Sequence, residues 1–326
     1  MQQATSTATI DSTPLTFSEI LPVFPPKGSV FASNLFWPGL LTALVTGLLW
    51  LPFVQNSAEI YFKIIAYYIV LMTLLIFYLN AGPNKRLGPT VFAAILTALI
   101  LWVPYLTRPY FYFFRELPSL HEPTTKNFFD RFSYYFVIAG LMEELIKATP
   151  ALILLAMTPI LGVGRNRYLG RLGIHAPIDG VLMGIASGGA FTLIEILEQY
   201  VPRLMNDIAT ELSKLTVSPE QTYIFHQMAE LTTFSLGFLL LMPRILGALI
   251  GHMSYAVVFG YFIGLAAFHR ASILVLLAIG WLTAATMHGI WDASGDINQT
   301  LYIGVASFLI SFAYFIKARA MSQNLA

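Results

Sequence analysis

Apolar stretches long enough to cross a bilayer recur along the whole chain, and they constrain its fold more than any other feature. Because a helix rises about 1.5 Å per residue, about 20 apolar residues span the hydrocarbon core. Only 11% of the 326 residues are charged, whereas a typical soluble domain has about 25%. The sequence therefore predicts an all-α polytopic membrane protein. About eight transmembrane helices are expected, at Leu35–Val54, Ile60–Leu79, Pro89–Leu106, Phe132–Ile160, Ala176–Tyr200, Arg244–Phe268, Ser272–Ser294 and Leu301–Lys317.

One further stretch, Thr222–Met242, is apolar enough to be a ninth span but carries His226 and Glu230. Pro243 follows it directly, and a proline is expected to break a helix. We therefore predict a helix at the membrane surface that ends at Pro243, with a separate span from Arg244 onward.

The predicted spans divide the chain into four parts. Residues 1–34 are expected to be a flexible tail, residues 35–131 three accessory helices and a loop, residues 132–295 the core, and residues 296–326 the last transmembrane helix and a cytoplasmic tail. The short loops on one side are basic and almost free of acids, which places both termini in the cytoplasm by the positive-inside rule. A net charge of +1 without an extended basic patch argues against a nucleic-acid partner.

The predicted span Phe132–Ile160 contains a cluster of charges: Glu143, Glu144 and Lys147. An acid or base near the bilayer centre costs about 2.5–3.5 kcal/mol, so such a cluster indicates a functional site. On a helix Lys147 lies one turn from both glutamates and can neutralise one of them. The other glutamate is then available for chemistry.

Four more polar residues lie inside later predicted spans: Glu195, His252, His288 and Asp292. Helix rise places all of them in the same, extracytoplasmic half of the membrane as Glu143. An intramembrane active site in a central four-helix core explains this shared depth. Asp292 follows His288 by one helical turn, so its carboxylate can orient the imidazole.

The span Ala176–Tyr200 carries a strip of small residues that predicts close helix packing: Gly180, Gly184, Gly188 and Gly189. Small residues let the backbone of a neighbouring helix approach closely. Asp179, near the start of the same span, is too far along the helix from Glu195 to share a site with it. We expect Asp179 to cap the helix N-terminus.

These residues, in this order, resemble the PrsW family of intramembrane proteases, which is related to the CAAX-processing and bacteriocin-processing membrane proteases. The resemblance covers roughly residues 134–294. Its motifs are the glutamate pair with lysine (Glu143, Glu144, Lys147), a glycine-spaced helix ending in Phe-x-x-x-Glu (Asp179, Gly180, Gly184, Gly188, Phe191, Glu195), an Arg and His pair (Arg244, His252) and His-x-x-x-Asp (His288, Asp292). It implies cleavage of a membrane-associated protein, similar to an anti-sigma factor, on the extracytoplasmic side of a bacterial cell membrane.

Hydrolysis of an amide needs a base for water, a donor for the oxyanion and an acid for the leaving amine. We expect Glu143 or Glu144 to activate water, the two histidines to stabilise the oxyanion or carry the proton, and Lys147 to hold the second glutamate. The expected catalytic residues are Glu143, Glu144, Glu195, His252, His288 and Asp292, with Lys147 and Arg244 in supporting roles. This mechanism uses no cofactor.

Three alternatives remain open at this point. A zinc ion could be held by His252, His288 and either Glu195 or a glutamate of the pair, although the sequence has no H-E-x-x-H motif and no cysteine. A proton- or cation-coupled transporter also needs acids and histidines in the membrane, but usually shows inverted halves and broken helices. In a non-catalytic scaffold, the polar cluster would only hold helices together.

Overall fold

The computed structural model describes residues 36–51, 54, 57–83, 85–124, 127–161, 173–214, 222–295 and 297–323, and no strand occurs within these ranges. The predicted tail, residues 1–34, lies outside them. The main helices are α2 (Phe36–Leu49), α4 (Ala58–Asn80), α5 (Leu87–Trp102), α6 (Pro104–Phe111), α7 (Phe128–Tyr135), α8 (Glu144–Leu161), α9 (Pro177–Glu195), α10 (Val201–Ser213), α11 (Thr222–Ala266), α12 (Ile273–Ala293) and α13 (Ile297–Gln323). Three π-helical segments, η2 (Tyr112–Glu116), η3 (Phe136–Glu143) and η5 (Ile196–Tyr200), and the 3₁₀ turn η7 (Arg270–Ser272) join them.

Several described helices are long and apolar enough to cross a membrane, as an all-α polytopic membrane protein requires. There are five: Ala58–Asn80, Pro177–Ile208, Ile245–Ala266, Arg270–Ala293 and Gln299–Gln323. A sixth span results if α5 and the helix after it, which are bent by 80°, are counted together. These five or six are fewer than the eight spans that the sequence predicts. The first expected span is a helix of only 14 residues, α2.

The predicted span Pro89–Leu106 is wrong at its C-terminal end. Helix α5 stops at Trp102, and Val103 has an extended backbone with φ −98° and ψ 106°. The cause is Pro104, because a proline disfavours the helical conformation of the residue before it. The chain then turns by 80° into α6 and η2.

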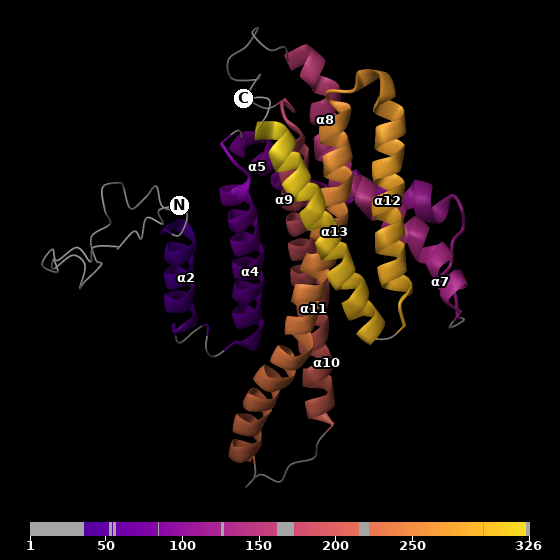
Figure 1. The fold of residues 1–326 in the computed structure, drawn as a ribbon. Helices are drawn as coiled ribbons and strands as arrows, with labels where there is room; N and C mark the ends of the chain where they lie inside the picture. The colour runs from indigo at the N-terminus through magenta and orange to yellow at the C-terminus, as the bar shows by residue number, and fades with distance from the viewer. Residues whose placement is uncertain are drawn as a thin grey trace, which may run out of the picture.

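The prediction that Pro243 ends a helix is also wrong. Helix α11 runs without interruption from Thr222 to Ala266, with Pro243 inside it. An interior proline removes one backbone hydrogen bond and tilts the helix, but it need not terminate a long one. Figure 1 shows the two parts of α11 inclined to each other. The N-terminal part pairs with α10, and together they extend beyond the ends of the other helices (Figure 1).

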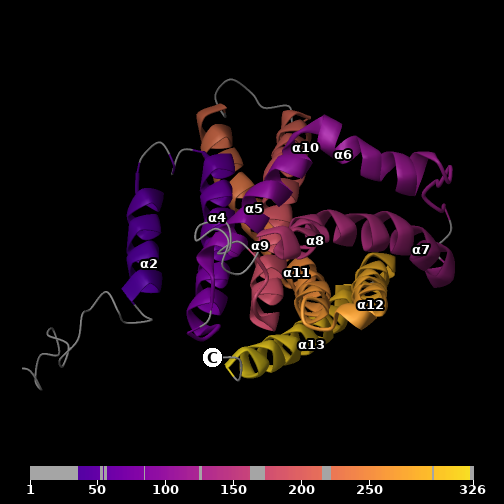
Figure 2. The ribbon, with the colours of Figure 1, turned by 90° about the horizontal axis from the view of Figure 1, so that it is seen from above.

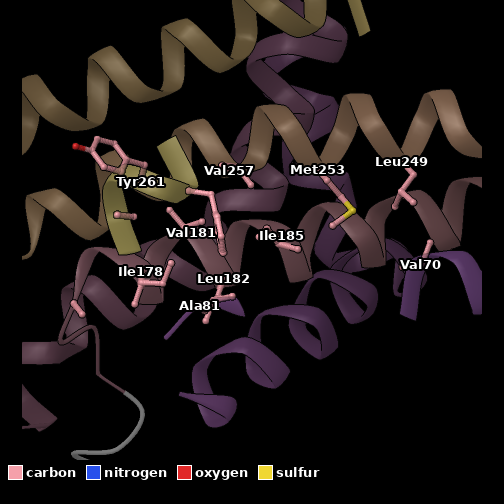
Figure 3. Packing of buried hydrophobic residues seen from close by; sticks show 13 residues of the cluster. Val70, Ala81, Ile178, Val181, Leu182, Ile185, Leu249, Met253, Val257 and Tyr261 are labelled. Carbon is pink, nitrogen blue, oxygen red and sulfur yellow. The ribbon is translucent and has the colours of Figure 1, made fainter. Parts of the chain in front are cut away.

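Helix α9 is the centre of the bundle, and nearly all of its residues are buried. Viewed along the bundle, α4, α5, α8 and α11 surround it, while α2 stands at the edge (Figure 2). Apolar side chains such as Val181 and Ile185 of α9 pack with Met253 and Val257 of α11 (Figure 3). The central position of α9 fixes the place of Glu195, its last residue.

The glycine strip has the predicted packing role. A Cβ added at Gly180 or Gly184 would overlap the backbone carbonyl of Gly260 or Ala256 on α11, and one added at Gly188 would lie 2.7 Å from the carbonyl oxygen of His252. The exception is Gly189, which instead faces α4. The first three glycines therefore bring the backbones of α9 and α11 into direct contact beside the polar cluster.

The N-terminus of α9 is capped as expected. The Asp179 carboxylate accepts hydrogen bonds from the backbone N–H groups of His175 at 2.9 Å and Ala176 at 3.0 Å. The N–H of Ile178 donates a 3.1 Å hydrogen bond to the hydroxyl oxygen of Ser322, which lies in the last turns of α13. These bonds satisfy N–H groups that a helix start leaves without partners.

Candidate active site

The glutamate pair lies where a π-helix becomes an α-helix. Glu143 is the last residue of η3, and Glu144 is the first of α8. Short π-helical segments shift the hydrogen-bond register and are frequent at functional sites. Trp281 of α12 donates a 2.9 Å hydrogen bond to the carbonyl of Leu141 in this segment. The indole therefore ties η3 to the helix that carries His288.

A buried ion pair separates the roles of the two glutamates. The Lys147 ammonium lies 2.7 Å from Oε1 of Glu144, and both side chains are fully buried. It lies 3.8 Å from Oε2 of Glu143, whose side chain is 23% exposed. The same ammonium lies 4.4 Å from the ring centre of Phe191. Lys147 therefore neutralises Glu144 more closely than Glu143.

His288 bridges the two glutamates. Its Nδ1 is 2.8 Å from Oε1 of Glu144, whereas its Nε2 is 3.8 Å from Oε2 of Glu143 and 3.4 Å from Oδ2 of Asp292. A carboxylate that is paired with lysine can only accept hydrogen bonds, so the proton of a neutral His288 lies on Nδ1. Its Nε2 lone pair then faces Glu143. The sequence suggested Asp292 as the partner of this histidine, but Glu144 lies closer to it.

The tautomer of His252 follows from its contact with lysine. Its Nδ1 lies 2.8 Å from Nζ of Lys147, and its Nε2 lies 2.8 Å from Oε2 of Glu195. An ammonium group can only donate, so Nδ1 accepts, and Nε2 carries the proton that is donated to Glu195. The ring of His252 packs edge-on against that of His288, with centroids 5.0 Å apart.

A cavity of about 350 Å³ opens beside these residues. Its lining is contributed by the end of α7, η3, the end of α9 with η5, and the helices α11 and α12. The polar residues and aromatics that line it are Tyr135, Glu143, Glu195, Tyr200, His252, Tyr255, His288, Trp291 and Asp292. Glu144 is not part of this lining. Within the glutamate pair, the carboxylate available to a molecule in the cavity is therefore that of Glu143.

The structure brings six of the predicted site residues together: Glu143, Glu144, Glu195, His252, His288 and Asp292. Lys147 joins them through three contacts of 3.8 Å or less. The side chain of Arg244 lies outside the part that the structure describes. Sequence reasoning missed Tyr255, which lines the cavity one turn after His252 on α11. That helical spacing was the signal that could have found it.

Arg131 is a second residue that sequence reasoning missed. Its guanidinium donates hydrogen bonds to the backbone carbonyls of Asp292 at 3.1 Å and Ser294 at 3.2 Å. These carbonyls lie at the C-terminal end of α12, where a positive charge is favourable. Arg131 therefore fixes the end of the helix that carries His288 and Asp292.

One group of side chains in the described ranges could hold a metal ion. It consists of Glu143, His252 and His288, whose ligand atoms lie within 4.8 Å of one another. The zinc alternative derived from the sequence named either Glu195 or a glutamate of the pair as the third ligand beside the two histidines. In the structure Glu143 takes that place, while Glu195 lies against Nε2 of His252.

A comparison with family models identifies the family of the chain. The model described as PrsW family intramembrane metalloprotease matches residues 86–317, well over half of the chain. The chain belongs to the PrsW family. The protein is therefore a peptidase of the membrane, as the sequence indicated, rather than a transporter or a scaffold. No curated protein and no solved structure matches the chain.

Membership of the PrsW family bears on the question of a cofactor. The match runs from α5 into α13 and includes every residue of the polar cluster. The family is described as metalloproteases, and the Glu143, His252 and His288 group offers a set of ligands. A bound metal is thus possible, although the sequence favoured a mechanism without one.

Proposed function

We propose that this PrsW protein hydrolyses peptide bonds of membrane-associated proteins in the cavity beside Glu143. The observation that carries the proposal is the unequal environment of the glutamate pair. Glu144 is fully buried and bound to Lys147 at 2.7 Å, whereas Glu143 lines the cavity and its Oε2 has no hydrogen-bond partner in the described part of the chain. A carboxylate placed in this way can accept a proton from water.

The neighbouring groups fit the remaining steps of amide hydrolysis. Water attacks the carbonyl carbon, its proton passes to Glu143, and the electron pair of the carbonyl moves to oxygen. When the C–N bond breaks, a proton must reach the leaving amine. His252 is placed to supply one from Nε2 if its Nδ1 takes a proton from Lys147 at the same time, and the proton that Glu143 has accepted from water restores the lysine after release of the products. Glu144 holds His288 through Nδ1.

The residues present also fit a metal ion, and we propose Glu143, His252 and His288 as its ligands. With a metal bound, Glu143 would act as a ligand and not as the base that takes a proton from water. Two histidines and a glutamate are a ligand set of catalytic zinc sites, which leave one position for water. Oε2 of Glu143, which accepts no hydrogen bond from the described residues, and the Nε2 lone pair of His288 face each other at 3.8 Å. Binding through Nε2 of His252 would displace a proton. A metal here would polarise the peptide carbonyl and make bound water more acidic.

The proposed substrate is an extended segment of a membrane protein, for which an anti-sigma-factor-like protein would be one example. Support comes from the position of the cavity near the C-terminal ends of α9 and α12, where Glu195 and Asp292 lie. The distribution of loop charges favours an extracytoplasmic position for these ends, and the membrane we propose is that of a bacterial cell. The projecting pair of α10 and the N-terminal part of α11 lies at the same end (Figure 1).

The proposal is tested by comparing the membrane proteins of cells that produce the wild-type chain with those that produce Glu143→Gln. New protein termini, identified by mass spectrometry, should appear only with the wild-type chain. Glu59→Gln is a matched control, because Glu59 forms an exposed ion pair with Lys63 and neither residue lines the cavity. If Glu143→Gln cells show the same new termini as wild-type cells, Glu143 is not the catalytic group.

A further inference from the structure

Tyr255 is a buried aromatic residue in the wall of the cavity, and the roles described so far do not use it. It lies on α11, three residues after His252, and its exposure is 0%. Its ring stacks on the imidazole of His288, with centroids 4.9 Å apart and planes inclined by 26°. The hydroxyl is buried and makes no hydrogen bond of regular geometry to the described residues, although the hydroxyl of Ser307 lies near it.

A buried hydroxyl without a partner is unfavourable, by about 1–3 kcal/mol, unless another group satisfies it at some stage. Leu or Phe would fill this space without that penalty, since the ring already packs on His288. A phenol that lines a reaction cavity and makes no hydrogen bond of regular geometry at rest is therefore placed for a group that arrives with the substrate. Such groups are polar atoms that develop charge during the reaction.

The backbone of α11 leaves room for the hydroxyl. A Cβ added at Gly251 would lie 3.2 Å from the Tyr255 hydroxyl oxygen. Side chains on a helix lean toward its N-terminus, which directs the Tyr255 phenol over the turn that contains Gly251. Gly251 and Tyr255 both line the cavity, as do His252 and Glu143. The hydroxyl thus lies at the same wall as the proposed general base.

We propose that Tyr255 is a catalytic residue that donates a hydrogen bond to the oxyanion formed during peptide hydrolysis. The inference rests on the proposed function. As water adds to the carbonyl carbon, the C=O electron pair moves to oxygen, and the phenol O–H binds that oxygen while keeping its own proton. When the C–N bond breaks, the electron pair returns to form the new carboxyl group, and the phenol is released unchanged.

A structural alternative exists for the same hydroxyl. Ser307 of α13 is a buried hydroxyl close enough to Tyr255 to interact with it. If the phenol served only to join α11 to α13, removing either hydroxyl would have the same effect. Ser307→Ala therefore distinguishes a structural role from the catalytic role.

The experiment uses the full chain in lipid nanodiscs and an internally quenched peptide selected from a mixed-sequence library for cleavage by the wild-type protein. Tyr255→Phe should lower kcat by about 10²- to 10³-fold, the usual effect of losing one oxyanion donor, with KM changed little. Tyr261→Phe is the matched control, because Tyr261 lies on the same helix and its hydroxyl contacts the sulfur of Met321 instead of the cavity. Tyr261→Phe and Ser307→Ala should both cleave at close to the wild-type rate.

A binding measurement provides a readout other than turnover. A phosphinate version of the same peptide carries tetrahedral oxygens where the oxyanion forms, and such analogues report binding to the transition state. Tyr255→Phe should weaken phosphinate binding by a factor similar to the loss in kcat/KM, while the affinity of an uncleavable amide peptide stays at the wild-type value. Thermal unfolding should be unchanged by the substitution.

Three results would overturn the assignment of Tyr255: a wild-type kcat for Tyr255→Phe, an equal loss for Ser307→Ala, or equal weakening of phosphinate and amide binding. In each of these cases the wild-type chain still cleaves, so the proposed function stands. A wild-type chain that cleaves no peptide of the library would instead refute the proposed function, and the role of Tyr255 with it.

Discussion

Replacing Lys147 by methionine should destabilise the protein strongly, because it leaves Glu144 as a buried charge without its cation. Both side chains of this 2.7 Å ion pair are fully buried. Removing one partner of a buried pair costs about 3–5 kcal/mol. Since about 1.4 kcal/mol is a factor of ten, the unfolded fraction should rise by roughly 10²- to 10⁴-fold.

The double variant Lys147→Met with Glu144→Gln should be more stable than Lys147→Met alone. Both charges are then absent, and the amide oxygen at position 144 can still accept the hydrogen bond from Nδ1 of His288, which is 2.8 Å long in the structure. The departure from additivity should fall in the upper part of the range of about 0.5–3 kcal/mol that is seen for contacting residues. The free energies of unfolding of the wild type, Lys147→Met, Glu144→Gln and the double variant are measured from the loss of helix content during reversible unfolding in mixed detergent micelles.

The matched control is the ion pair of Lys63 with Glu59, which is 2.6 Å long but has side chains 33% and 47% exposed. Lys63→Met should change the free energy of unfolding by about 0–1 kcal/mol, the usual range for a surface pair. The reasoning is refuted if the double variant loses as much stability as the two single variants combined. It is also refuted if Lys147→Met is as mild as Lys63→Met.

Three further predictions concern packing, positioning and the metal. Gly184→Ala should lower the free energy of unfolding by about 1–3 kcal/mol or more, because its methyl group would overlap the carbonyl of Ala256. Gly39→Ala should not lower it, since nothing lies within 4 Å of the added Cβ. Chemical unfolding of both variants checks this, and an equal loss of stability in the two would contradict it. Arg131→Ala removes two hydrogen bonds at the end of α12, so the free energy of unfolding should fall by about 1–3 kcal/mol. Cleavage per folded molecule should fall as well, and unchanged cleavage would argue against a positioning role for Arg131. Phenanthroline should stop cleavage and added zinc should restore it, whereas cleavage that survives complete chelation would favour the metal-free glutamate mechanism.

The position of the site could be predicted from the sequence because charges inside apolar spans are rare and unfavourable. Glu143, Glu144 and Lys147 stand out for this reason, as do His252 and His288. The divergence of the two glutamates was also predictable, since adjacent helical residues point about 100° apart. The sequence could not predict which glutamate contacts the lysine and which lines the cavity. The reason is that the π-helical segment η3 changes the rotation of the helix just before Glu144.

The errors in the helix boundaries both involve proline, in opposite ways. Pro104 ended a helix that the apolar pattern continued to Leu106, and the restriction on the residue before proline was sufficient to predict it. Pro243 did not end α11. The residues on both sides of Pro243 are helical. Nothing in the local sequence distinguishes a proline that bends a helix from one that terminates it.

The most direct test of the account is hydrolysis of the selected quenched peptide by purified wild-type, Glu143→Gln and Glu144→Gln proteins in ¹⁸O-labelled water. The wild-type protein should produce fragments whose new carboxyl group carries one ¹⁸O atom. Glu143→Gln should produce none while unfolding at the wild-type temperature, because its side chain faces the cavity, whereas Glu144→Gln should lose stability through its buried partner Lys147. Labelled fragments formed by Glu143→Gln at the wild-type rate would contradict the central claim.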